Sequence, residues 1–141
     1  MNPTIDAVAR RGLAGLRGPV ASVAAAAVAF TVVGLVDPNQ PGRYPTCPFL
    51  AVTGHYCPGC GTLRAMHALT QGDLSAAAGR NVLALASLPV LAWIWLRWAQ
   101  RSWTGAARTQ LAPAALIWAL AIGVVLFGLI RNLPFGAALA P

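Results

Sequence analysis

The sequence has no lysine and no glutamate, and charged residues make up only 9% of its 141 positions. All ten basic residues are arginine, and the three acidic residues are Asp6, Asp37 and Asp73. A soluble domain carries roughly a quarter charged residues, so this chain has too few polar groups to cover a surface in water. The arginines lie mainly at the ends of apolar runs rather than in a cluster, which argues against nucleic-acid binding.

Hydrophobic residues, at 57% of the chain, gather instead into three long apolar stretches at 19–36, 82–99 and 112–130. Each comes close to the roughly 20 helical residues that are needed to cross a bilayer. We therefore predict an all-α integral membrane protein with three transmembrane helices, folded as one domain. Pro89, inside the second stretch, predicts a kink. A cleaved signal peptide is the alternative for the first stretch, because arginines precede it.

The arginines also predict the orientation, because cytoplasmic flanks of membrane spans hold an excess of positive residues. Placing segment 1–18, the connector 100–111 and the Arg97 end of the second stretch in the cytoplasm assigns six of the ten arginines to that side. The loop 37–81 and the tail 131–141 then lie outside the cytoplasm. The absence of lysine beside abundant alanine, glycine and arginine indicates a bacterial origin. We therefore expect a multi-pass protein of the bacterial inner membrane, with the bilayer as its first partner.

All three cysteines lie in the 37–81 loop, in the runs Cys47-Pro48 and Cys57-Pro58-Gly59-Cys60-Gly61. Proline presets the backbone and glycine lets it fold back, so that both sulfurs of the second run point the same way, as in a metal knuckle. The same two-residue spacing also suits a disulfide couple. The spacing alone does not choose between them.

Three interpretations of the thiols stay open at this point. In the first, Cys47, Cys57 and Cys60 bind zinc, with His55 or His67 as the fourth ligand of a tetrahedral site. In the second, a structural or redox disulfide forms, as an extracytoplasmic loop favours, although an odd number of thiols argues mildly against a framework of disulfides only. In the third, reduced thiols are packed without chemistry.

Two short helices are expected within the loop, too short to cross and therefore interfacial or re-entrant. The first covers 63–69, begins at Thr62 as its N-cap and ends at Gln71-Gly72. The second begins after Asp73, which caps a run at 74–78 that continues into the second span.

Besides the cysteines and histidines, three side chains are candidates for function: Arg64, Asn81 and Asp73, the cap of the second short helix. Arg64 lies four positions after Cys60 and is expected to contact the loop or an anionic headgroup, or to snorkel to the membrane interface. Asn81 lies at the start of a span, where an amide that caps a helix is the simplest explanation. Asn132, at the end of the third stretch, has the same explanation.

The spaced combination of these motifs resembles a family of bacterial membrane proteins known as domain of unknown function 2752. The resemblance covers about 47–98, and 131–134 is similar to that family's ending; it rests on the pairs and runs Cys47-Pro48, Thr53-Gly54, Cys57-Pro58-Gly59-Cys60-Gly61, Arg64-Ala65, Gly72-Asp73 and Asn81. It implies a small helical membrane protein with this cysteine loop, and it implies no activity.

The predicted function is accordingly that of a non-enzymatic accessory or assembly component, whose cysteine loop is held by a metal or a disulfide and which meets a membrane protein partner or a second copy of itself. The alternative is a membrane thiol–disulfide oxidoreductase, in which Cys57 attacks and Cys60 resolves the mixed disulfide. The absence of a thioredoxin-like strand-to-helix pattern around the loop lowers that alternative. Transport is a weaker third possibility, because no acidic residue lies inside a predicted span.

Overall fold

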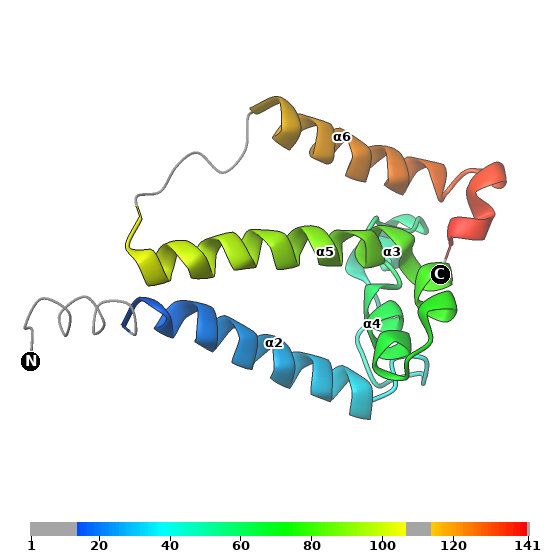
Figure 1. Cartoon of the computed structure of the whole chain (residues 1–141). Helices are drawn as coiled ribbons and strands as arrows, with labels where there is room; N and C mark the ends of the chain where they lie inside the picture. Colours follow the sequence, from blue (N-terminus) through cyan, green and yellow to red (C-terminus); the bar gives the residue numbers. More distant parts are fainter. Residues whose placement is uncertain (1–13, 107–113, 141) are drawn as a thin grey trace, which may run out of the picture. The chain divides into compact units, whose positions relative to one another are not determined.

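The computed structural model describes residues 14–106 and 114–140, and the N-terminal arginines Arg10 and Arg11 and the connector's Arg108 lie outside these ranges. Every regular element within them is a helix, which confirms the all-α class (Figure 1). The elements are α2 (Arg17–Leu35), α3 (Pro48–Thr53), α4 (Thr62–Thr70), α5 (Leu74–Thr104), α6 (Ala114–Ile130) and the 3₁₀ helix η1 (Pro134–Leu139).

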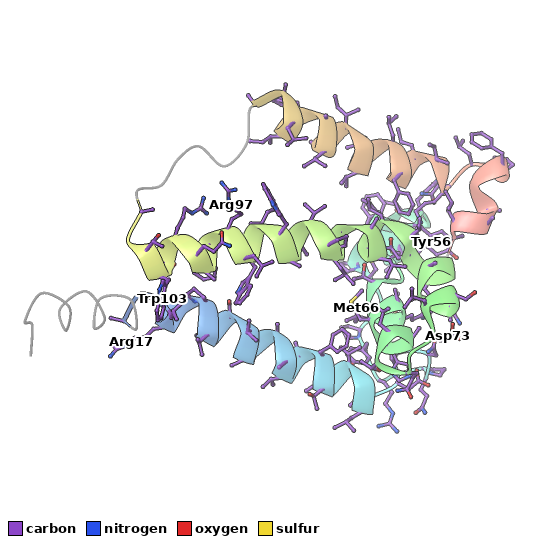
Figure 2. All side chains as sticks on the ribbon, in the orientation of Figure 1. Arg17, Tyr56, Met66, Asp73, Arg97 and Trp103 are labelled. Atoms are coloured by element: carbon purple, nitrogen blue, oxygen red, sulfur yellow. The ribbon has the colours of Figure 1, made fainter. Side chains whose placement is uncertain are left out.

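Two of these helices are long and apolar enough to cross a membrane: α2 with 19 residues and α5 with 31. The third predicted span corresponds to α6, which has 17 described residues and is shorter than the roughly 20 that a perpendicular crossing requires. Large apolar side chains are exposed along all three helices; they include Val20, Val28, Leu91, Leu96, Ile117 and Leu120. Figure 2 draws the side chains of these helices as sticks.

The second predicted short helix and the second span form one element, α5. Its start is capped as expected, since the Ala76 N–H donates to Asp73 Oδ1 at 2.8 Å. Inside α5 the backbone leaves helical geometry at Asn81, with φ −162° and ψ 93°, and Pro89 lies further along the same helix. The reason is local: Asn81 Oδ1 accepts the Ala84 N–H at 3.0 Å and so starts a new helical segment inside the element.

Contacts within the chain define two compact units, of which the first is Met1–Val28 with Leu88–Leu111. Its described part joins the start of α2 to the end of α5, where Trp95 Nε1 donates to Ser22 Oγ at 3.0 Å. Gly18 permits the close approach, because a Cβ there would lie 3.1 Å from the Trp98 ring. Arg17 and Trp103 lie at the same end of this unit (Figure 2).

The second unit is Ala29–Ser87 with Ala112–Pro141 and contains the whole cysteine loop. Helix α4 begins one residue earlier than predicted: Gly61, with φ 83°, is the N-cap, and Thr62 is already helical with its hydroxyl donating to Gly59 O at 2.7 Å. His67 ties α4 to the end of α2 through a 2.8 Å contact between Nδ1 and the Val33 carbonyl. Helix α3, directly after Cys47, was not predicted.

Candidate metal centre

Cys57 and Cys60 stand at the two ends of a tight turn, in which the Cys60 N–H donates to the Cys57 carbonyl at 3.0 Å. Pro58 and Gly59 fill the middle of this turn, as the sequence predicts for a backbone that must reverse. The turn brings the two Sγ atoms to 3.3 Å from each other. Cys60 is buried, with 8% of its surface exposed.

The third thiol reaches the same point from the N-terminal end of α3. Cys47 Sγ lies 3.6 Å from Cys57 Sγ, and all three sulfurs lie within 4.8 Å of one another. The cysteines are free thiols. In a tetrahedral zinc site with Zn–S bonds of about 2.3 Å the sulfurs are about 3.8 Å apart. The three thiols are therefore spaced as ligands of one metal ion would be.

The carbonyl side of the turn is held by the buried amide of Asn81, which is 2% exposed. Its Nδ2 donates to Pro58 O at 2.9 Å and to Cys60 O at 3.1 Å, and it lies 3.2 Å from Thr62 Oγ1. Its Oδ1 serves as the helix cap described above. The predicted cap is therefore real, and the same side chain also fixes the backbone of the cysteine turn.

A second buried donor reaches the same carbonyls from the end of α6. Arg131, also 2% exposed, donates through Nη1 to Cys57 O at 3.0 Å and Cys60 O at 3.1 Å, with Pro58 O at 3.4 Å. Its Nη2 donates to Leu139 O at 2.9 Å. Arg131 and Asn81 therefore both bind the backbone carbonyls of the cysteine turn.

Asn132 extends this clamp to the residue before the turn. Its Nδ2 donates to Tyr56 O at 2.8 Å while its Oδ1 accepts the Tyr56 N–H at 2.8 Å. The amide therefore pairs with both backbone groups of Tyr56, which is labelled in Figure 2. Nδ2 also donates to Gly128 O at 2.7 Å, so Asn132 caps α6 as predicted and joins it to the cysteine loop.

Among the described residues, no carboxylate pairs with the guanidinium of Arg131. The ion pair found there joins His67 and Asp37 instead. Aromatic rings flank the guanidinium, with Phe127 at 5.1 Å and Tyr56 at 5.9 Å. Burial lowers the pKa of Arg131 below its usual value, and charge on Cys60 and Cys57 acts in the opposite direction. The neighbouring groups that can carry a compensating negative charge are the thiols of Cys60 and Cys57 and the hydroxyl of Tyr56.

The three thiols differ in their acidity. Burial raises the pKa of Cys60 to about 12, with its neighbour Cys57 adding to the effect. The Leu50 N–H at the first turn of α3 lowers the pKa of Cys47 from its usual value. A metal ion would have to displace the proton of Cys60, whereas Cys47 is closer to its thiolate form.

A cavity of about 630 Å³ opens in front of the sulfurs. Its lining includes the three cysteines and Arg64, together with the polar residues Asn39, Gln40, Tyr44, Thr46 and Thr62. Arg64 is half-buried in the first turn of α4. Arg64 was expected to lie near the cysteine turn, and it lines the same cavity as the three cysteines.

The two histidines lie away from the thiol cluster. His55 is exposed, with Nδ1 2.7 Å from the Thr53 carbonyl. His67 has its Nδ1 on Val33 O and its Nε2 3.6 Å from Asp37 Oδ1. Neither is among the residues whose ligand atoms come together with the three sulfurs. Neither His55 nor His67 is therefore placed to supply the fourth ligand of a metal ion bound by the three thiols.

Sequence reasoning did not assign Arg131 to the site, and it gave Asn132 a capping role alone. Both lie more than 70 residues from the cysteine turn, as the separations of 74 and 76 positions show. The available signal was an Arg-Asn pair placed directly after an apolar helix. That signal is also typical of ordinary membrane flanks, so it did not point to the cysteines.

Residues 47–95 match the model of a family described as Protein of unknown function (DUF2752), which confirms the resemblance seen in the sequence. The matched region contains the three cysteines, Arg64 and Asn81, and it ends before Arg131 and Asn132. Comparison with curated proteins and with solved structures finds no match for the chain.

Proposed function

We propose that this chain is a small bacterial membrane protein that binds one thiophilic metal ion, Zn²⁺ in the first place, through Cys47, Cys57 and Cys60. The observation that carries the proposal is the convergence of three sulfurs within 4.8 Å of one another, from two separate parts of the loop. The role is that of a non-enzymatic accessory or assembly component, in which the metal holds the loop in shape. A cluster of three thiolates suits zinc, since sulfur is among its preferred ligands.

The buried charge of Arg131 supports metal over disulfide. A disulfide between Cys57 and Cys60 is neutral and would leave the arginine buried beside uncharged groups, which is unfavourable. Zn²⁺ with three thiolates carries one net negative charge, which compensates the guanidinium. The carbonyl contacts of Arg131 place that charge directly behind the turn.

Membrane insertion is supported by the length and exposure of the apolar helices. The core helix of a soluble protein is mostly buried, whereas in the most apolar windows of α2 and α5 only 11% and 0% of the residues are buried. Arg97 lies over the Trp93 ring at 5.6 Å near the end of α5, a pairing typical of the headgroup region. We place the N-terminus and the 100–111 connector in the cytoplasm and the cysteine loop outside it, in a plasma membrane with three crossings.

Metal analysis tests the proposal. The protein purified in detergent under reducing conditions should contain close to one zinc per chain. The Cys57→Ser variant, which loses the sulfur that lies nearest to both of the others, should contain much less. His55→Ala is the matched control and should keep its zinc, because this imidazole contacts Thr53 rather than the thiols. Well-folded wild-type protein that takes up no zinc contradicts the proposal.

Alkylation of cysteines in intact cells, compared with lysed cells, tests the orientation. Cysteines outside the cytoplasm react with a membrane-impermeant maleimide in intact cells once the metal is removed. Protection in intact cells that disappears on lysis would place the loop in the cytoplasm and contradict the proposed topology.

A second candidate function is thiol–disulfide exchange, which the 3.3 Å approach of Cys57 and Cys60 favours. Cys57 would attack a substrate disulfide, and Cys60, buried behind it, would resolve the mixed disulfide. The Cys60→Ser variant should then accumulate a mixed disulfide on Cys57. Its absence in cells under both oxidising and reducing growth excludes this candidate.

A further inference from the structure

The guanidinium of Arg64 is left without a partner in the described part of the chain. Among residues 14–106 and 114–140, no carboxylate pairs with its guanidinium and no hydrogen bond holds it. Arg43, in the same loop, differs in this respect, since its Nε donates to Gln40 Oε1 at 3.1 Å. A half-buried guanidinium with five donors and no acceptor is a binding group for an anion.

The cavity in front of the thiols puts this arginine and the sulfurs around one space. The described lining of its 630 Å³ contains no aspartate or glutamate, so nothing in it competes for the arginine. Thr46 and Thr62 also line the cavity. A space of this size takes a ligand well beyond a single water molecule.

The coordination of the proposed metal leaves one position open. Three sulfur ligands fill three of the four sites of a tetrahedral ion, and the two histidines are engaged elsewhere. Sites with three protein ligands keep the fourth for water or an external ligand. With Zn²⁺ and three thiolates at one net negative charge, Arg131 and Arg64 together leave one positive charge over. A singly charged anion balances it.

We propose that this cavity binds a carboxylate, with one carboxylate oxygen on the metal and Arg64 on the carboxylate. The inference rests on the metal proposed above. A carboxylate carries the single charge that the site lacks, and its two oxygens match the fork of a guanidinium. The carboxylate can belong to a small acid or to the end of a peptide chain, and both present the same group to the site.

Cobalt substitution tests the inference, because the visible spectrum of Co²⁺ reports its ligands. The full-length protein in detergent, reduced and free of oxygen, is loaded with Co²⁺ and titrated with acetate, then with N-acetylglycine, with N-acetylglycinamide as the uncharged control. We expect both acids to shift the cobalt bands and the amide to leave them unchanged. Tighter binding of N-acetylglycine than of acetate assigns the site to peptide ends, and equal binding assigns it to small acids.

Two arginine variants complete the test. Arg64→Gln should take up Co²⁺ as the wild type does, while its apparent affinity for the acids falls about tenfold or more, the effect of losing a charge-assisted hydrogen bond. Arg43→Gln, the matched control, should respond as the wild type does, and Arg64→Lys should lie between. Equal acid binding by Arg64→Gln and wild type overturns the inference.

The experiment gives different results if the carboxylate site is wrong and if the metal site is wrong. Co²⁺ uptake with a spectrum that no acid changes overturns the carboxylate site and leaves the metal site standing. Absence of Co²⁺ uptake by well-folded wild-type protein overturns both. Far-ultraviolet circular dichroism of each variant shows that the helices are intact, and retained Co²⁺ uptake by Arg64→Gln shows that its loop is folded.

Discussion

The amide of Asn81 offers the sharpest test of how the cysteine turn is held. In Asn81→Ala both functions of the side chain are lost: the donor to the carbonyls of the turn and the acceptor that caps the second part of α5. In Asn81→Asp the acceptor remains, but a carboxylate now faces the oxygens of Pro58 and Cys60. We therefore expect metal affinity to fall in the order wild type, Asn81→Ala, Asn81→Asp.

The magnitude follows from the contacts. Two buried hydrogen bonds to Pro58 and Cys60 contribute about 0.5–1.5 kcal/mol each, or roughly 1–3 kcal/mol together. The lost cap adds about 1 kcal/mol, which acts mainly on the helix. If the turn bonds are formed only in the metal-binding conformation, their loss weakens zinc binding by about 5- to 150-fold. Asn81→Asp adds the burial of a charge beside like partial charges and should exceed that range.

Competition with a chromophoric zinc chelator measures the affinity of each variant. Gln71→Ala is the control, because this exposed amide donates only to the adjacent Thr70 hydroxyl among the described residues. Helical content by circular dichroism separates a released loop from a lost fold. Equal zinc affinity of Asn81→Asp and wild type would refute the argument, since a carboxylate cannot donate to the turn carbonyls at neutral pH.

Three further predictions concern pH, reactivity and packing. Because the pKa of Cys60 is raised to about 12, zinc must displace its proton on binding. The apparent zinc affinity should therefore rise between pH 6.5 and 8.5, by about tenfold per pH unit for each proton released. Calorimetry in two buffers of different ionisation enthalpy measures the number of protons released. In metal-free reduced protein at pH 8, Cys47, with its lowered pKa, should be alkylated faster than Cys60, which mass spectrometry of timed samples measures. Gly136→Ala should lower the free energy of unfolding by about 1–3 kcal/mol, because a Cβ there would collide with the Ile130 carbonyl. Gly79→Ala has open space around the added Cβ and should instead raise the free energy of unfolding by about 0.5–1 kcal/mol. Thermal unfolding measures both.

Local features of this protein follow from local residues. The apolar runs predict α2 and α5, because an uninterrupted apolar run of about 20 residues is by itself typical of a helix long enough to cross a membrane. The Cys-Pro-Gly-Cys-Gly run predicts the turn, since proline and glycine act on their own backbone. Asp73 predicts the start of α5 for the same reason, through a hydrogen bond that spans three positions. The existence of α3 was missed because six residues after a proline carry little periodic signal.

The site itself was settled by contacts that no spacing encodes. The sequence by itself determined that the three cysteines share one loop between apolar helices, and therefore that metal or disulfide chemistry was the question. Only the tertiary structure decided that Cys47 lies next to the other two sulfurs and that neither histidine does. It also decided that Arg131 donates to the carbonyl of Cys57. These contacts depend on how α4, α5 and α6 fold back on the loop, and hydrogen bonds between residues 74 positions apart leave no pattern in a single sequence.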